Sequence, residues 1–254
     1  MFNIGSLVTR KSYNNDIVFK ITNIENDICY LKGLNTRLIA DAKLDDLKPY
    51  NASEDIEDEE SFREKLKETI ALNRDDYFYL PGRILHIDGD IDYLNRCLDY
   101  YKANNINAIG INESEETLSS HIKSLLDEYT PDIVIITGHD AYYKKNGSYK
   151  NSQNFINAVK EARKYESSHD KLIIIAGACQ SNYEELIKAG ANFASSPKRI
   201  NIHALDPAII ATKISLLETT QNIDLKELLE KTKYGSAGIG GICTKGTMYV
   251  GYPR

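Results

Sequence analysis

Two short apolar runs, each followed by a reactive side chain, constrain this chain more than any other feature. The first run, in residues 131–140, leads to His139, and the second, in residues 171–180, leads to Cys179. Each run is too short for a helix and is closed by a glycine, which is typical of a strand buried on both faces of a parallel sheet. Residues 152–165 have room for one helix between them. The segment therefore predicts a strand, a crossover helix and a second strand.

Such crossovers are right-handed almost without exception, so the two strands are expected to run in the same direction. Their carboxyl ends then lie at one end of the sheet, where open parallel sheets bind ligands. A thiol and an imidazole that meet there are the minimum for a cysteine nucleophile with its base. We expect Cys179 to be the nucleophile and His139 the base, with His203 in a later loop as the reserve base.

The rest of the chain predicts two domains joined by a linker. Residues 1–50 contain four short strand-like runs separated by turn residues, which is typical of a small antiparallel β-barrel of SH3-like size. Residues 51–80 are first acidic and then alternate in charge, which indicates a solvated helix or a flexible linker. In residues 81–254 strands alternate with helices. That pattern predicts a three-layer α/β domain with a mostly parallel sheet.

Composition narrows the classes of function. The net charge of −6 gives no general basis for nucleic-acid binding, and no apolar run is long enough to span a bilayer. The four cysteines have no paired spacing, so we expect reduced thiols in a cytoplasmic protein rather than disulfides. The sequence has no CxxC or HExxH pattern, and cysteine chemistry needs neither a metal nor an organic cofactor. We expect no membrane or nucleic-acid partner, and the ligand of the barrel stays open.

Two other interpretations of the thiol also stay open. In a non-enzymatic scaffold protein, Cys179 would pack as a small hydrophobe. The pattern Gly177-x-Cys179-x-Ser181 also partly resembles the nucleophile elbow of α/β-hydrolases and glutamine amidotransferases. A cysteine-dependent amidase of that kind predicts a base that follows the nucleophile in the chain. It would favour His203 over His139.

The order of the two reactive residues is similar to that of one clan of cysteine peptidases. In caspases, gingipains, clostripain and legumain, an apolar run that ends in histidine precedes a run that ends in Ala-Cys, as Ala178-Cys179 does here. The similarity implies a caspase-like fold and an oxyanion hole made by the amides of Cys179 and of the turn from Gly138 to Asp140. The clan usually has glycine after the histidine, where this chain has Asp140.

A narrower resemblance extends over nearly the whole chain. Several segments look like the YabG family of sporulation peptidases from endospore-forming bacteria, and they are specific to it: Ile4–Gly5, Arg10–Tyr13, Leu38–Ala40, His86–Asp90, Ile136–Tyr142, Ala176–Ser181, Ala189–Pro197 and Asn201–Pro207. The acidic segment of residues 51–76 looks shorter than in that family and different from it.

The resemblance implies a cysteine endopeptidase that cleaves after basic residues, arginine above all, and processes spore-coat and related proteins during sporulation. It implies self-processing too, and Arg63 and Arg74 in the linker are accessible candidates for the cut. The expected location is the cytoplasm of the sporulating mother cell and the spore coat, which is also where a scaffold protein would act.

An arginine pocket needs a carboxylate that can bind a guanidinium through paired hydrogen bonds. Asp88 and Asp90 follow the first strand of the second domain, at the same end of the sheet as the expected dyad. In gingipain-like enzymes the specificity acid comes from that strand end, so the resemblance makes Asp88 the first choice. Asp140 and Asp206 are rivals. The loops after the nucleophile helix are expected to line the substrate cleft, with hydroxyl groups from Ser195 and Ser196.

Overall fold

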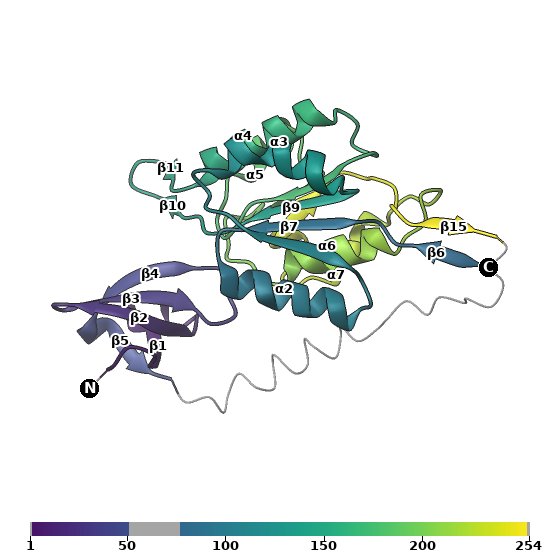
Figure 1. The fold of residues 1–254 in the computed structure, drawn as a ribbon. Coiled ribbons are helices and arrows are strands. Elements are labelled where there is room, and N and C mark those ends of the chain that lie inside the picture. Colours follow the sequence, from purple (N-terminus) through teal and green to yellow (C-terminus); the bar gives the residue numbers. More distant parts are fainter. Residues whose placement is uncertain (1, 51–76, 253–254) are drawn as a thin grey trace. The chain divides into compact units, whose positions relative to one another are not determined.

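A computed structural model describes residues 2–50 and 77–252 (Figure 1). The chain divides into two compact units, and each is described by itself. The expected self-processing sites, Arg63 and Arg74, lie outside the described residues. None of the helices in the described part of the chain is long and apolar enough to cross a membrane.

The amino-terminal unit is an antiparallel sheet with strand order β4-β3-β2-β1-β5. Its strands are β1 (Leu7–Arg10), β2 (Phe19–Glu25), β3 (Ile28–Gly33), β4 (Ile39–Lys43) and β5 (Leu47–Pro49). Side chains alternate along them, so Phe19 and Ile21 of β2 pack with Cys29 and Leu31 of β3 in an apolar core. Asn26 takes the left-handed conformation that the tight turn between β2 and β3 requires. The predicted antiparallel sheet is confirmed, and its SH3-like character stays a prediction.

The second unit is built on a six-stranded sheet with strand order β14-β13-β12-β9-β7-β8. The five strands from β13 to β8 are parallel, and β14 runs antiparallel to β13. The predicted largely parallel sheet is therefore confirmed. The strands are β7 (Ile84–Asp88), β8 (Ala108–Asn112), β9 (Ile133–Thr137), β12 (Ile173–Ala176), β13 (Phe193–Ser195) and β14 (Ile239–Gly241).

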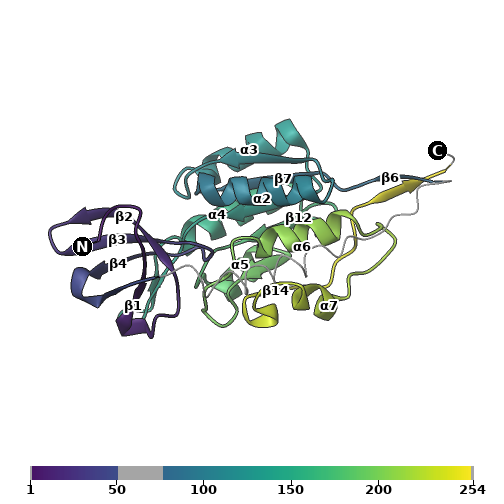
Figure 2. The ribbon, with the colours of Figure 1, turned by 90° about the horizontal axis from the view of Figure 1, so that it is seen from below.

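Helices cover both faces of this sheet, as Figures 1 and 2 show. One face carries α3 (Leu118–Tyr129), α4 (Ser152–Tyr165) and α5 (Tyr183–Ala189), and the other carries α2 (Ile91–Ala103), α6 (Asp206–Ser215) and α7 (Leu225–Glu230). Because both faces are covered, every residue of β9 and β12 is buried. This explains why the two runs read as continuous apolar stretches. The predicted helix over residues 152–165 has those bounds in the structure.

Five elements of the second unit have no counterpart in the sequence prediction. They are helix α7, strand β14, the two strands of a short hairpin, β10 (Tyr142–Tyr143) and β11 (Ser148–Tyr149), and strand β6 (Phe78–Leu80). Strand β6 lies within the range 51–80 that the sequence assigns to the linker. It pairs antiparallel with β15 (Tyr249–Gly251) in a ribbon separate from the main sheet.

Candidate active site

The two reactive residues occupy equivalent places after neighbouring strands. Ile136 of β9 is in register with Ala176 of β12, and His139 and Cys179 each lie three residues further along. The chain turns at Gly177, whose φ of 104° suits glycine, and the Gly177 amide donates to the Ile136 carbonyl at 3.0 Å. The loops that carry the thiol and the imidazole therefore start side by side at the carboxyl end of the sheet.

Cys179 is fully buried beneath a later loop. The Ile202 amide donates to its Sγ at 3.3 Å, and Sγ lies 3.8 Å from the Ile202 carbonyl oxygen. Next to it, the Gln180 amide donates to the Ile200 carbonyl at 3.1 Å and to Ser196 Oγ at 3.0 Å. The segment 200–202 thus covers the thiol. An N–H that points at sulfur stabilises the thiolate, the form that attacks a carbonyl.

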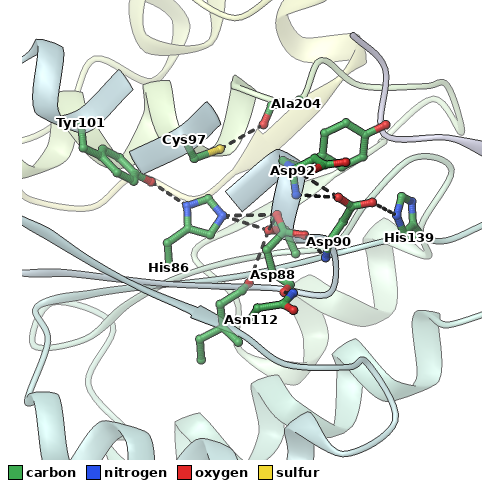
Figure 3. Close-up of polar contacts among 12 residues, drawn as sticks. His86, Asp88, Asp90, Asp92, Cys97, Tyr101, Asn112, His139 and Ala204 are labelled. Atoms are coloured by element: carbon green, nitrogen blue, oxygen red, sulfur yellow. Dashed lines mark hydrogen bonds and ion pairs between the residues drawn. The ribbon is translucent and has the colours of Figure 1, made fainter. Parts of the chain in front are cut away.

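The His139 ring is hydrogen-bonded through one of its two nitrogens in the described part of the chain. Its Nε2 lies 2.9 Å from Asp90 Oδ2, a contact drawn in Figure 3. The ring of Tyr93 packs against it at 5.6 Å between centroids. The Nδ1 atom is buried and has no hydrogen-bond partner among the described residues. A general base needs a carboxylate on one ring nitrogen and a second nitrogen that is not occupied by another hydrogen bond. The described contacts of His139 do not include a hydrogen bond to Cys179.

The backbone of His139 is fixed on both sides by residues that the sequence analysis missed. Its amide donates to Glu115 Oε1 at 2.7 Å, and its carbonyl accepts from Asn151 Nδ2 at 2.8 Å. Glu115 lies so close over Gly138 that a Cβ there would be 2.3 Å from Oε1, so glycine makes room for the contact. A carboxylate shortly after a predicted strand could have marked Glu115 as a site residue. The contact of its side chain with the loop after β9 could not be predicted from the sequence.

Asp88 and Asp90 form a connected pair after β7 (Figure 3). Asp90 caps α2 through Oδ1, which accepts from the amides of Asp92 and Tyr93, and uses Oδ2 for His139. Asp88 is fully buried, and its Oδ1 accepts from the Asp90 amide at 2.9 Å. Both carboxylates therefore hold the chain that holds His139.

The other oxygen of Asp88 belongs to a buried polar group within the sheet. Asp88 Oδ2 accepts from Thr137 Oγ1 at 2.8 Å and lies 3.6 Å from His86 Nε2. The His86 ring also contacts Thr137 Oγ1 at 3.0 Å and the Tyr101 hydroxyl at 2.9 Å, through its two nitrogens (Figure 3). Burial without hydrogen bonds would be costly for these groups, so the contacts make Asp88 part of the internal structure.

The remaining predicted site residues lie at the same end of the sheet. Asp206 is fully buried, and its carboxylate accepts from the amides of His203 and Lys233 at 3.0 and 2.9 Å. Ser196 uses its hydroxyl to hold the Gln180 amide. Ser195 is fully buried, and its Oγ has no hydrogen-bond partner in the described part of the chain.

The turn after β9 offers a backbone donor beside His139. The N–H of Asp140 donates to no residue that the structure describes. An oxyanion hole requires a backbone donor of this kind. Elsewhere, the described residues contain no group of three or more His, Cys, Asp or Glu side chains that could hold a metal ion.

A site with a thiol, a carboxylate-bound imidazole and a free amide at the carboxyl end of a parallel sheet is typical of a hydrolase. The sequence matches the model of the YabG peptidase U57 family over residues 3–253, so the chain belongs to that family. It is also similar to the sporulation-specific protease YabG of Bacillus subtilis (strain 168). The two are 42% identical over 285 residues, which cover 99% of this chain and 98% of the relative. The chain is therefore a sporulation-specific protease of the YabG family.

A comparison with solved structures gives a much weaker likeness. The receiver domain of the histidine kinase CKI1 from Arabidopsis thaliana, complexed with Mg²⁺ and BeF₃⁻, is 13% identical in sequence, with a TM-score of 0.29. The match covers 45% of this chain and 85% of that domain. A likeness of this size carries no weight for the fold or for the site.

Proposed function

We propose that this protease is a cysteine endopeptidase with Cys179 as nucleophile and His139 as general base. One observation supports these roles above the others. His139 is bound to Asp90 through Nε2, with Nδ1 open, at the position after β9 that corresponds to Cys179 after β12. The strand order and the chain order of the two residues also support the caspase-like fold that the sequence predicts.

In the proposed mechanism the Cys179 thiolate attacks the scissile carbonyl carbon and forms a C–S bond. The amides of Cys179 and Asp140, in the turn that begins at Gly138, stabilise the negative charge that develops on the carbonyl oxygen. His139, protonated by the thiol, gives its proton to the leaving amine as the peptide bond breaks. It then takes a proton from water as the water oxygen attacks the acyl carbon. The C–S bond breaks, the carboxylic acid leaves, and His139 returns the proton to the sulfur. Asp90 acts through His139 as a positioning residue.

Substrate binding must displace the segment that covers the thiol. Cys179 is fully buried under Ile202, so a peptide carbonyl reaches Sγ only after residues 200–202 move. The movement would also affect the neighbouring His203, whose amide donates to Asp206 Oδ2 at 3.0 Å. Loss of that bond removes one donor from the Asp206 carboxylate at the moment when substrate enters.

This coupling bears on the specificity for arginine. Asp88, Asp90 and Asp206 all use their carboxylates in the contacts described, so a guanidinium must replace existing donors at any of them. Asp88 and Asp90 would lose contacts that hold strand ends and His139. Asp206 would lose only the hydrogen bond from the His203 amide, which the movement of residues 200–202 already breaks. We therefore propose that Asp206 receives the basic side chain and that Ser195 and Ser196 line the adjoining cleft.

The biological substrates are proposed to be spore-coat and related proteins, together with the chain itself. The Bacillus subtilis relative is a sporulation-specific protease, and this similarity supports action during sporulation. Spore-coat substrates, coat association and self-cleavage follow from the family resemblance alone and form part of the proposal.

Intact-mass spectrometry of the purified protein tests the function. The wild type is incubated alone beside Cys179→Ala, with Cys97→Ala as the matched control, because Cys97 is also fully buried, on α2. We expect fragments that end in a basic residue from the wild type and Cys97→Ala, and none from Cys179→Ala. An arginine-containing peptide library is digested in parallel. Cleavage by Cys179→Ala in either assay would contradict the proposed nucleophile.

A second candidate function keeps one observation in its favour. His203 directly follows Ile202, whose amide contacts the Cys179 sulfur, so a base after the nucleophile is close in the chain to the thiol. A cysteine-dependent amidase would use this histidine. In that case His203→Ala abolishes hydrolysis of small amides while His139→Ala retains it, and the peptidase proposal predicts the reverse order.

A further inference from the structure

The side chain of Asp140 forms a buried junction of its own beside the dyad. The residue is 3% exposed and follows His139 directly. Its Oδ1 accepts from the amides of Ala141 and Asn151, each at 2.8 Å. Its Oδ2 accepts from the hydroxyls of Ser152 and Ser181, the latter at 2.9 Å. All four partners are donors, which is the set that a carboxylate binds and a neutral amide side chain cannot fully replace.

On one side the junction holds the nucleophile loop. The Ser181 hydroxyl that donates to Asp140 also accepts from the Ala178 amide at 2.9 Å. Ala178 and Ser181 lie on either side of Cys179 in the chain, so this hydroxyl closes the loop around the nucleophile. The Ser152 hydroxyl in turn accepts from the amide of Asn182, the residue that caps α5, at 2.9 Å.

On the other side the junction holds the base. Asn151 donates its amide to Asp140 Oδ1, and its side-chain Nδ2 donates to the His139 carbonyl at 2.8 Å. The carboxylate therefore connects three segments: the turn after β9, the start of α4 and the loop after β12. A shift of either loop changes the distance between sulfur and imidazole, and a displacement of about 1 Å can cost roughly a hundredfold in rate.

We propose that Asp140 is a positioning residue that fixes the Cys179 loop against the His139 loop through Ser181 and Ser152. The role rests on the proposed cysteine peptidase function and adds to it a side chain that touches neither substrate nor sulfur. It also gives a reason for an aspartate directly after the base. The backbone N–H of Asp140 serves the oxyanion, while its carboxylate sets the geometry in which the oxyanion forms.

Ser181→Ala is the sharpest probe, because it removes one hydroxyl from the junction and leaves the Asp140 carboxylate in place. The matched control is Ser215→Ala. Ser215 is also fully buried and donates to a backbone carbonyl, that of Gly82 at 2.8 Å, but Gly82 precedes β7 at the opposite end of the strands. Ser181→Ala loses two buried hydrogen bonds and Ser215→Ala loses one, so both variants are expected to lose thermal stability, Ser181→Ala the more.

The experiment measures kcat, KM and the pH dependence of kcat/KM on a fluorogenic peptide amide that ends in arginine. For Ser181→Ala we expect kcat to fall by roughly tenfold or more, with KM little changed and the pH profile shifted. Ser215→Ala should keep the wild-type kcat and pH profile. Ser152→Ala and the double variant Ser152→Ala/Ser181→Ala should show non-additive losses, because both hydroxyls act through one carboxylate.

The outcomes separate the two levels of the proposal. Equal kcat values for Ser181→Ala and Ser215→Ala, or losses in the serine pair that simply add, overturn the positioning role while the peptidase function stands. If the wild type cleaves the arginine peptide no more than Cys179→Ala does, the proposed peptidase function is wrong, and the positioning role is wrong with it.

Discussion

The Asp90 carboxylate links His139 to a helix. Its Oδ2 lies 2.9 Å from His139 Nε2, and its Oδ1 accepts from the first amides of α2. One side chain therefore ends a loop, starts a helix and orients an imidazole. Because Oδ2 contacts His139 and Oδ1 caps α2, a substitution can weaken the contact with His139 and keep much of the helix cap.

Asp90→Asn is expected to lower kcat by about a hundredfold, because an amide no longer fixes the ring through a charged hydrogen bond. Asparagine caps helices about as well as aspartate does, so the thermal midpoint should change little. Steady-state kinetics and thermal unfolding measure the two effects. Asp224→Asn, at the cap of α7, is the matched control. Equal kinetic losses in the two variants would contradict the positioning of His139 by Asp90.

Asp206→Asn tests the proposed arginine pocket. We expect kcat/KM for an arginine peptide to fall by about tenfold or more, relative to the same peptide with neutral citrulline, because a charged hydrogen-bonded pair is lost. Asp88→Asn should instead lower the free energy of unfolding by about 1–3 kcal/mol, because it disturbs buried hydrogen bonds. It should leave the ratio between the two peptides unchanged. A lower preference for the arginine peptide in Asp88→Asn, with no change in Asp206→Asn, would assign the arginine pocket to Asp88 instead.

Because residues 200–202 cover the Cys179 thiol, two alkylating reagents are expected to modify different cysteines. Iodoacetamide should modify the exposed Cys243 well before the buried Cys179 in the substrate-free protein, as peptide mapping by mass spectrometry can show. A chloromethyl ketone that carries arginine should instead modify Cys179, because its side chain binds as a substrate does and displaces residues 200–202. Rapid reaction of Cys179 with iodoacetamide alone would show that the segment does not shield the sulfur.

His169 predicts a loss of stability in mild acid. Burial, and next the nearby Arg163 guanidinium, lower the pKa of its imidazole from the ordinary value. The unfolded chain therefore binds a proton more readily, so the stabilisation is present above the unfolded pKa of about 6.5 and is lost as the pH falls through the lower folded value. Denaturant unfolding between pH 7.5 and 5 should show a weaker pH dependence for His169→Asn than for the wild type. His121→Asn on the exposed side of α3 is the control, and parallel curves for all three proteins would contradict the prediction.

The sequence predicts the elements that place His139 and Cys179, because those elements have strong local patterns. Runs of buried aliphatic residues predict β9 and β12, and helical spacing predicts α4 between them, so the equivalence of His139 and Cys179 follows from the sequence. The family could be recognised in the same way, since its segments extend over the whole chain, and the comparisons confirm it.

The contacts that complete the site are not local, and the sequence did not predict them. Glu115 reaches the His139 amide from another strand end, and Ile202 covers Cys179 from a loop that follows two further elements. Such contacts depend on how separate loops meet after the sheet has formed, and no spacing along the chain encodes them. The setting of Asp88 is only partly local. His86 lies two residues before it on β7, but the Thr137 hydroxyl reaches it from the neighbouring strand β9.

The ribbon of β6 and β15 has a consequence for any cut that the protease makes in its own chain. Residues 78–80 are hydrogen-bonded to residues 249–251, and the ring of Phe78 lies against Gly251. The first and last described strands of the second unit are therefore paired with each other. Cleavage upstream of residue 77 would leave residues 77–252 with this pairing between their two outermost strands intact.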